Sequence, residues 1–368
     1  MIGSTDVFVI GGGPAGLAAA IAARRKGFRV TLADLSGPAA DKACGEGLMP
    51  ETLEALRSLG VEIPLSHGRP FRGIRFLDSS LSVEAGFPAG HGIGVRRTTL
   101  HSLLAEHAAA CGVRLLWRTN VTGITAHGVV LTEGHVHSRW IVGADGGNSP
   151  VRGWSGMDPA VPAPRRFGFR RHYRVEPWTD RVEVHWGPSC QIVVTPVGPG
   201  EVCAALISSD AKLRIADALP LFPALAARLQ TALPASLERG ATCVTLRLPR
   251  VFRDDVVLLG DASGSVDAIT GQGLYLAFFQ AIALADAMAR GDLAHYQAAH
   301  RRLARRPALM ARLMLALDGR PRLRRRVLRI FAEEPRLFAR MLAIHVGSAT
   351  AVDCAVNGLR LGWRMVTP

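Results

Sequence analysis

Three glycines near the N-terminus have the spacing of a phosphate-binding turn. Gly11, Gly13 and Gly16 stand between a short apolar run and a segment with helical periodicity. Such glycines permit a tight turn, close approach of the backbone to a pyrophosphate and close packing of the helix on the strand. The helix that follows would aim unpaired N–H groups and its positive end at the anion. We predict that these glycines, together with Pro14 and Ala15, bind a dinucleotide.

An acidic residue ends the next predicted strand. Asp34 lies 18 residues beyond Gly16, close to the spacing at which a carboxylate accepts hydrogen bonds from a ribose. Its negative charge would disfavour a 2′-phosphate on that ribose. A glycine-rich turn without a ligand is the alternative, but the strand, the helix and Asp34 in register favour a dinucleotide site.

Residues 41–50 contain two side chains that could move a proton. Cys44 and Glu46 alternate with Gly45 and Gly47. A thiol could deliver a proton to a carbanion-like centre, and a carboxyl group could accept or relay one. Cys44 could equally be a small residue buried for packing. We predict Cys44 and Glu46 as catalytic residues.

These side chains need a scaffold, and the periodicity predicts alternating strands and helices. A β-α-β unit begins the chain, and later buried strands near residue 142 and at 256–259 each end in a glycine-rich turn. The glycines at 90–94 are predicted as a loop. A mixed or antiparallel sheet is predicted from 165–175, 181–187, 191–197 and 201–208, and helices from 98–111, 273–290 and beyond Asp292.

Three further segments resemble those of the flavoprotein group that includes p-hydroxybenzoate hydroxylase and the geranylgeranyl reductases. Residues 97–100 resemble the Arg-x-x-Leu start of a helix near the flavin, and residues 142–152 resemble a second fingerprint associated with FAD and the nicotinamide donor. Residues 257–262 resemble a third, whose aspartate binds the ribityl chain. Each segment alone could be an ordinary arginine, turn or helix cap, but their order supports the resemblance. It covers most of residues 1–290 and implies FAD, with NAD(P)H as a transient reductant.

The resemblance also implies a set of FAD-binding residues. Residues 270–273, Thr-Gly-Gln-Gly, resemble the geranylgeranyl reductases, and their backbone N–H groups would face the flavin pyrimidine. The predicted cofactor-binding residues are Gly11, Gly13, Pro14, Ala15, Gly16, Asp34, Gly45, Arg97, Val121, Asp145, Asp261, Gly271, Gln272 and Gly273.

Two segments imply different reactions. The loop with Cys44 resembles the Cys-Gly-x-x-Leu loop of the geranylgeranyl reductases, which contributes a cysteine near the reacting double bond. Residues 195–198, Thr-Pro-Val-Gly, resemble instead a strand of the hydroxylases whose proline borders the flavin, and the aromatic strand of the reductases is missing. The predicted substrate residues are His185, Trp186, Gln191, Thr195 and Pro196, although a histidine and a tryptophan in a sheet are more often core or surface residues.

The leading functional hypothesis is an NAD(P)H-dependent flavin monooxygenase that hydroxylates a hydrophobic, aromatic or lipid-like small molecule. The alternative enzyme resembles the geranylgeranyl reductases and saturates isoprenoid double bonds. A third hypothesis, from another class, is a non-catalytic FAD-binding protein of a membrane surface.

The fold class that follows is α/β, with a doubly wound, Rossmann-like, three-layer FAD-binding domain, an inserted mixed β-sheet domain for the substrate, and C-terminal helices. We expect the FAD-binding domain at 1–65, 95–160 and 250–290, the substrate domain at 66–94 and 161–249, and the helical region at 291–368.

Charge and cysteine content limit the partners. Lys and Arg outnumber Asp and Glu by 44 to 30, which implies an anionic partner. Residues 301–329 hold eleven arginines and one acidic residue, so they could lie on an anionic membrane or form a solvated helical face. Aromatic residues make up only 6% of the chain and nucleic-acid motifs are absent, which argues against nucleic acid.

The six cysteines lack zinc-site spacing, and no segment before the first strand has room for a signal peptide. We therefore predict no metal, reduced thiols, and a protein that is cytoplasmic or peripheral to the inner face of a membrane.

Overall fold

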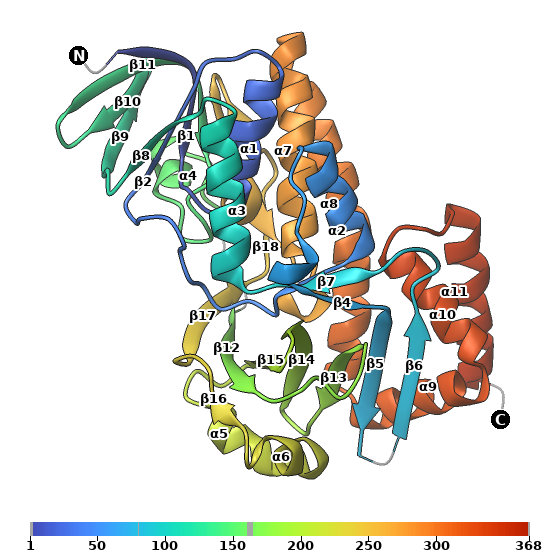
Figure 1. The fold of residues 1–368 in the computed structure, drawn as a ribbon. Coiled ribbons are helices and arrows are strands. Elements are labelled where there is room, and N and C mark those ends of the chain that lie inside the picture. The colour runs from blue at the N-terminus through green and yellow to red at the C-terminus, as the bar shows by residue number, and fades with distance from the viewer. Residues whose placement is uncertain (1–2, 80, 160–164, 367–368) are drawn as a thin grey trace.

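The computed structural model describes residues 3–79, 81–159 and 165–366. It confirms the predicted fold class: a doubly wound domain, a second mixed sheet and a C-terminal group of helices (Figure 1). The boundary expected between residues 160 and 161 lies outside the described residues.

The first sheet has parallel strands at its centre. Its order is β20-β11-β1-β2-β8, with β19 antiparallel to β20 at one edge and the β9-β10 hairpin paired with the first half of β11. The central strands are apolar almost throughout because both of their faces are buried. The bounds are β1 (Ser4–Ile10), β2 (Val30–Asp34), β8 (Arg114–Trp117), β9 (Val121–Thr125), β10 (Gly128–Leu131), β11 (Gly134–Gly143), β19 (Phe252–Arg253) and β20 (Val256–Leu258).

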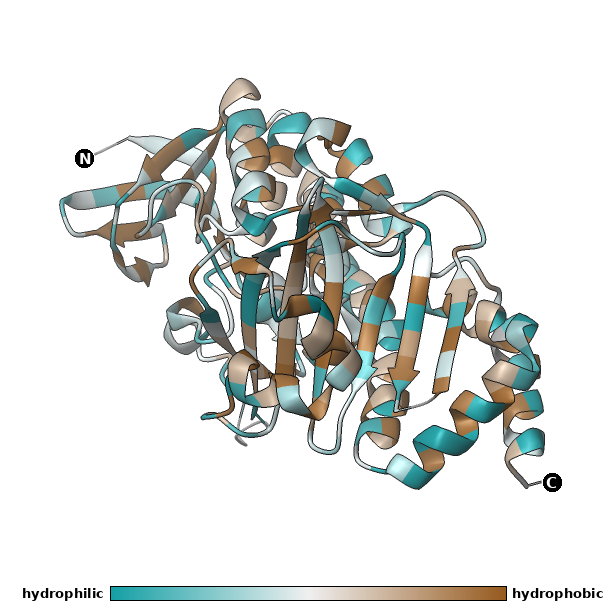
Figure 2. Ribbon diagram, turned by 60° about the horizontal axis from the view of Figure 1, so that its bottom comes forward, coloured by the Kyte–Doolittle hydropathy of each residue, from teal (hydrophilic) through white to brown (hydrophobic). Residues whose placement is uncertain are grey.

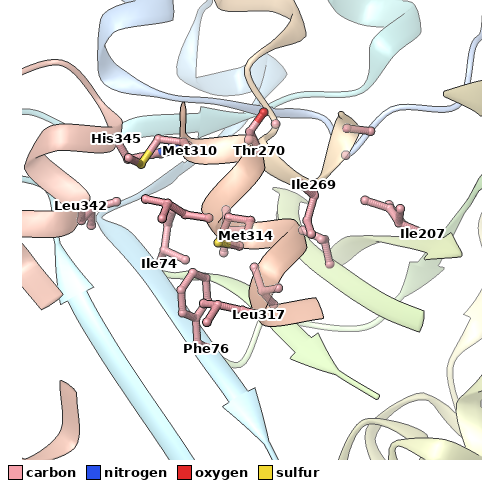
Figure 3. A pocket seen from close by; sticks show the side chains of 18 of the residues that line it. Ile74, Phe76, Ile207, Ile269, Thr270, Met310, Met314, Leu317, Leu342 and His345 are labelled. Atoms are coloured by element: carbon pink, nitrogen blue, oxygen red, sulfur yellow. The ribbon is translucent and has the colours of Figure 1, made fainter. Parts of the chain in front are cut away.

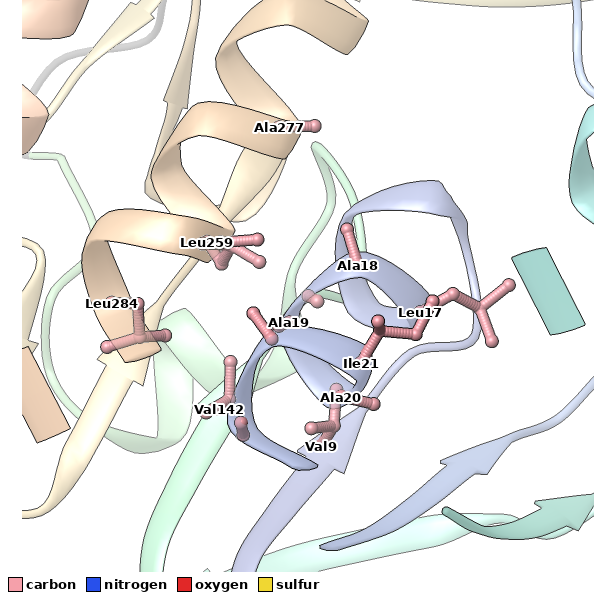
Figure 4. Packing of buried hydrophobic residues seen from close by; sticks show 14 of the residues in the cluster. Val9, Leu17, Ala18, Ala19, Ala20, Ile21, Val142, Leu259, Ala277 and Leu284 are labelled. Carbon is pink, nitrogen blue, oxygen red and sulfur yellow. The ribbon is translucent and has the colours of Figure 1, made fainter. Parts of the chain in front are cut away.

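Helix α1 (Pro14–Arg25) lies at the centre of this domain. Figure 4 shows it between Val9 and Val142 of the sheet and Ala277 and Leu284 of α7 (Gly273–Arg290). Its run of alanines lets the sheet and α7 approach closely, since small side chains shorten the distance between packed elements. The other helices of the domain are α2 (Pro50–Ser58), α3 (Arg97–Ala110) and the short α4 (Pro150–Trp154).

The second sheet has the order β16-β12-β15-β14-β13-β5-β6, and β17 also pairs with β12. β13 and β5 are parallel, although they come from distant parts of the sequence, and the other neighbours are antiparallel. Helices α5 (Ile215–Ala218) and α6 (Pro223–Leu229) cover one face (Figure 2). The strand bounds are β5 (Gly73–Asp78), β6 (Leu81–Gly86), β12 (Arg165–Arg174), β13 (Val182–Trp186), β14 (Cys190–Gly198), β15 (Glu201–Ser208), β16 (Leu233–Pro234) and β17 (Arg239–Val244).

Two small sheets join the domains. One contains β3 (Gly47–Leu48), β7 (Gly92–Gly94) and β4 (Arg69–Phe71), and the other pairs β18 (Leu246–Arg247) with β21 (Gly264–Ser265). The prediction of a loop at 90–94 is therefore wrong for β7. Its glycines serve close packing, because a Cβ on Gly94 would lie 1.8 Å from the carbonyl oxygen of Pro196.

Four helices complete the chain: α8 (Leu293–Asp318), α9 (Pro321–Glu333), α10 (Pro335–His345) and α11 (Ala351–Val366). α8 packs along α7, while α9 and α10 cover β6 at the end of the second sheet (Figure 1). Phe338 joins these parts, because its ring lies 5.1 Å from that of Phe76 and 4.9 Å from that of Phe331. Among the described helices, none combines the length and the apolar character needed to cross a bilayer.

Helices α2, α7 and α8 enclose a carboxyl group. The side chain of Glu51 is only 10% exposed, and neither of its oxygens accepts a hydrogen bond from the described residues. The nearest positive charge is Arg306, whose Nη2 lies 3.9 Å from Oε1. Burial raises the pKa of Glu51 from 4.5 to about 7, and the charge of Arg306 offsets this only in part.

The raised pKa predicts a pH-dependent stability. In the folded chain Glu51 stays protonated up to about pH 7, whereas in the unfolded chain it ionises near 4.5, so its deprotonation costs stability as the pH rises between these values. We expect Glu51→Gln to match the wild type near pH 4 and to exceed its free energy of unfolding by about 3 kcal/mol above pH 7. Urea denaturation of both proteins at both pH values measures this difference. A constant difference across the pH range would contradict the assignment.

Candidate active site

The turn after β1 leaves backbone N–H groups available to an anion. α1 begins at Pro14 without a side-chain cap from the described residues, so the N–H groups of Ala15 and Gly16 lack partners within the helix. A Cβ on Gly16 would lie 1.9 Å from the carbonyl oxygen of Gly11, whereas a Cβ on Gly13 would meet no described atom within 4 Å. Gly16 therefore serves packing, and Gly13 borders open space of the kind that a pyrophosphate requires.

Asp34 and an unpredicted histidine hold this turn from two sides. Asp34 accepts hydrogen bonds from the backbone N–H groups of Gly12 at 2.5 Å and Ser36 at 2.6 Å. His101 Nε2 donates to the carbonyl oxygen of Gly12 at 2.8 Å, and its Nδ1 accepts from Ala39 N–H at 3.1 Å. Burial lowers the pKa of His101, which keeps the ring neutral, as this pattern requires. His101 lies one helical turn after Arg97, and this spacing could have indicated from the sequence that both side chains lie on the same face of the helix.

Three strand ends bring the predicted cofactor residues to one edge of the first sheet. Gly11 follows β1, Asp145 follows β11 and Asp261 follows β20, and these strands are parallel neighbours. Asp145 Oδ2 accepts from Val151 N–H at 3.0 Å, while its Oδ1 is buried without a partner among the described residues. Burial raises the pKa of Asp145.

The other predicted cofactor residues lie in different surroundings. Asp261 is half-exposed and pairs with Lys42 Nζ at 3.2 Å. Arg97 directs a buried Nε that lacks a partner in the described part of the chain. Val121 begins β9 and packs against the core of the first domain, away from the strand ends. These orphaned polar atoms, with the open space at Gly13, fit a bound dinucleotide.

A buried network fixes the loop that carries Cys44 and Glu46. Glu46 has a left-handed backbone with φ of 58°, which a non-glycine residue adopts at a cost in energy. Its carboxylate accepts from Arg97 N–H at 2.9 Å and from His172 Nε2 at 2.6 Å, and Arg170 Nε lies 3.7 Å away. Arg170 also pairs with Asp41. Glu46 thus joins the loop to α3 and to β12, and its side chain does not line the cavity described below.

Cys44 belongs to the same loop and, unlike Glu46, lines the cavity. Its Sγ accepts a hydrogen bond from Glu46 N–H at 3.4 Å. Cys203 Sγ donates to the carbonyl oxygen of Cys44 at 3.7 Å, and Thr195 Oγ1 donates to that of Gly45 at 2.7 Å. Burial raises the pKa of the Cys203 thiol well above its usual value, so it remains a donor.

Potential metal-ligand atoms of Glu46, His172 and Cys203 lie within 4.8 Å of one another. The hydrogen bond between Glu46 and His172 and the nearby guanidinium of Arg170 account for this cluster without a metal ion. His172 Nδ1 lies 2.9 Å from Ser236 Oγ, which places both ring nitrogens in the same network.

A cavity of about 490 Å³ extends from this loop to the C-terminal helices. Ala43, Cys44 and Gly45 border one end together with Thr270 and Gly271, and the walls come from β5, β12–β15 and α8–α11. The lining is apolar almost throughout, as Figure 3 shows for Ile74, Phe76, Ile269, Met310, Met314, Leu317 and Leu342. Polar side chains at this end include His345, whose pKa burial lowers to about 4, so the ring is neutral.

The five predicted substrate residues do not line this cavity. On β13 the side chains of Val182 and Val184 face it, and alternation turns His185 to the other face, where it lies 3.1 Å from Glu183. Trp186 shares the face of Val184 but packs under Phe76 and Arg324 beyond the cavity end.

On β14 the side chain of Val193 faces the cavity. Gln191 and Thr195 share that face and are covered by Asp318 of α8 and by the Gly45 loop respectively. Pro196 packs its carbonyl against Gly94 of the small sheet. Gln272, predicted for the cofactor, donates to the carbonyl oxygen of His345 at 2.7 Å, and Gly273 begins α7.

The sequence is similar to known flavoproteins and lipid reductases. Residues 4–174 match the family described as the FAD binding domain. The chain is 28% identical over 301 residues to the menaquinone reductase of Mycobacterium tuberculosis, covering 74% of this chain and 73% of that protein. It is 26% identical over 299 residues to digeranylgeranylglycerophospholipid reductase 1 of Methanothermobacter thermautotrophicus, covering 74% of each.

Solved structures show the same fold. A flavoprotein/dehydrogenase from Cytophaga hutchinsonii superposes with a TM-score of 0.80 over 93% of both chains, at 19% identity. A probable FAD-dependent monooxygenase from Pseudomonas aeruginosa superposes with a TM-score of 0.72 over 87% of this chain and 98% of that one, at 23% identity. With the site geometry, the family match and the sequence relatives show an FAD-dependent oxidoreductase that resembles the flavoprotein group named above, and the solved structures show its fold.

Proposed function

We propose that the protein is a reductase that saturates double bonds in the isoprenoid chain of a lipid. The observation that carries this proposal is the shape and chemistry of the cavity. It runs from the Cys44 loop past α8 to α11 and is lined by aliphatic, thioether and phenyl groups. A flexible hydrocarbon chain suits such a space, whereas a small polar aromatic would need several convergent hydrogen-bonding groups along the walls.

The relatives support the same substrate class. Two relatives with about three quarters of their length matched are named for menaquinone and for a digeranylgeranyl lipid, both of which carry isoprenoid chains. The rifampicin monooxygenase of Rhodococcus hoagii is 29% identical but matches only 40% of this chain. Similarity to the reductases thus extends into the parts that build the cavity.

Bound FAD, reduced by the NAD(P)H typical of this group, would supply a hydride to one carbon of the double bond. Residues of this chain must then hold the double bond, exclude water and protonate the second carbon. We infer that Cys44 protonates this carbon, because Cys44 lines the cavity together with Thr270 and Gly271 of the predicted flavin loop. Glu46 acts as a positioning residue, since its carboxylate fixes the loop from the side away from the cavity.

One observation favours hydroxylation as the second candidate. The Thr195-Pro196 segment of β14 lies directly behind the Cys44 loop, where Thr195 bonds to Gly45, as expected for the strand that resembles the hydroxylases. A hydroxylase needs O₂ for product formation and a reductase does not, so anaerobic assays separate the two. Oxidation of NAD(P)H by the FAD-loaded protein separates either enzyme from a non-catalytic FAD-binding protein.

A lipid substrate requires contact with the surface where the lipid resides. We infer that the arginine-rich C-terminal helices provide this contact and that the protein works at the inner face of a membrane. Exposed arginines of α9, among them Arg322, Arg325 and Arg329, support this inference.

The glycine turn predicts two distinct phenotypes. Gly13→Ala places a methyl group in the open space that the pyrophosphate needs, so the purified protein should lose FAD while the apoprotein keeps its free energy of unfolding. Gly16→Ala forces a contact of 1.9 Å with the backbone, so it should destabilise the apoprotein itself, by about 2 kcal/mol or more. Flavin absorbance and urea denaturation measure the two effects. Full FAD content in Gly13→Ala would remove this turn from the cofactor site.

The role of Cys44 predicts a selective loss of turnover. If its thiol donates the proton, Cys44→Ser should slow double-bond reduction by about tenfold or more, because a hydroxyl is a much weaker acid, while FAD content and flavin reduction by NAD(P)H stay near normal. Cys243→Ser is the matched control, because Cys243 also lines the cavity but on β17. Product formation from menaquinone in detergent, without oxygen, measures both. Equal rates in the two variants would leave Cys44 a packing residue.

A further inference from the structure

We propose that α11 inserts into an anionic lipid leaflet and forms the roof of the cavity, so that the substrate chain enters from the bilayer beneath this helix. The proposal deepens the proposed function and names the partner surface that serves the site. It combines three independent features of α11: its outer face, its inner face and the charge of the helices around it.

The outer face of α11 is apolar and exposed. Val352, Val356, Leu359 and Trp363 recur at intervals of three and four residues, which places them on one side of a helix. Leu359 is 76% exposed, among the highest values for the large apolar side chains described. A stripe of exposed large apolar residues on a terminal helix is typical of a contact with another apolar phase.

The inner face of the same helix closes the cavity. Gly358, Leu361, Gly362 and Met365 line it, and a Cβ on either glycine would meet no described atom within 4 Å. Both glycines are exposed, so they lie on the flank of α11 where the cavity meets the surface, and neither fills the space there. Only the thickness of one helix separates the apolar exterior from the apolar interior, so a hydrocarbon chain could pass beside α11 on the flank of Gly358 and Gly362, which carries no side chain.

The positive charge around α11 favours an anionic membrane as the partner. Residues 319–368 contain ten arginines and three acidic residues. Those acidic groups have local partners: Arg364 pairs with Glu333, Arg360 with Glu334, and Asp353 accepts from Thr350. An anionic leaflet complements this excess of positive charge, each basic residue near the surface contributing about 1 kcal/mol. A second copy of the chain would bring two basic faces together, which electrostatics opposes.

Sedimentation with lipid vesicles tests the outer face, using the full-length FAD-loaded protein. We expect it to bind vesicles of equimolar phosphatidylcholine and phosphatidylglycerol, to bind phosphatidylcholine alone less, and to be released by salt. Leu359→Ser should weaken binding by about tenfold, since it removes one inserted leucine. Leu237→Ser is the matched control, because Leu237 is equally exposed at 76% but lies in the second domain, far along the chain from α11.

Three results would overturn the proposal: no vesicle binding by the wild type, equal losses in both serine variants, or a wild-type dimer that Leu359→Ser converts to a monomer. The last would make this face a contact between copies. Because sedimentation requires no turnover, its result holds even if the proposed reaction is wrong.

Gly362→Leu tests the roof. Its side chain would occupy the open space on the flank of α11 where the cavity meets the surface, so reduction of menaquinone embedded in the same vesicles should slow by about tenfold while vesicle binding stays intact. An unchanged rate would refute entry beneath α11. Absence of activity in the wild type, with binding as expected, would refute the proposed reaction and leave the membrane contact standing.

Discussion

The site depends on the hydrogen bonds and ionic contacts of the Glu46 carboxylate. It lies in a loop of the first domain, and its partners are the backbone of α3 and the side chains of His172 and Arg170 from the second sheet. A buried carboxylate with three partners is stable only while all of them are present, since loss of one partner typically costs about 3–5 kcal/mol. The relative position of the two domains at the cofactor edge is therefore fixed by polar contacts rather than by apolar packing alone.

The loop at 44–46 therefore contributes both to the polar contact between the domains and to the wall of the cavity. Glu46 belongs to the polar network, while Cys44 and Gly45 line the apolar cavity with their carbonyl oxygens bonded to Cys203 and Thr195. Glu46 has a left-handed backbone at this point of the loop. The strain of that conformation is local and is offset by the network beneath it.

Local patterns in the sequence predicted the elements well and the second-domain contacts poorly. The glycine turn, Asp34 and the strand ends carrying Asp145 and Asp261 follow from periodicity and spacing, because each motif lies within one continuous segment. His185 and Gln191 depend on which face of a strand meets a helix more than 100 residues away, as the bond from Gln191 to Asp318 illustrates. Strand alternation gives two faces but does not say which one is covered. The polar network of Glu46 could not be predicted from the sequence for the same reason.

The parallel pairing of β5 with β13 has a consequence for how the chain folds. About a hundred further residues must be synthesised after β5 and β6 before β13, the neighbour of β5, is available for pairing. β20 and α7, which complete the first domain, follow later still. The buried cluster of the first domain includes Tyr296, and the cluster under α9 and α10 includes Val346, so neither can close until those residues have been synthesised. A chain with such long-range closure is expected to fold slowly and late, and to expose its apolar strands to chaperones in the meantime.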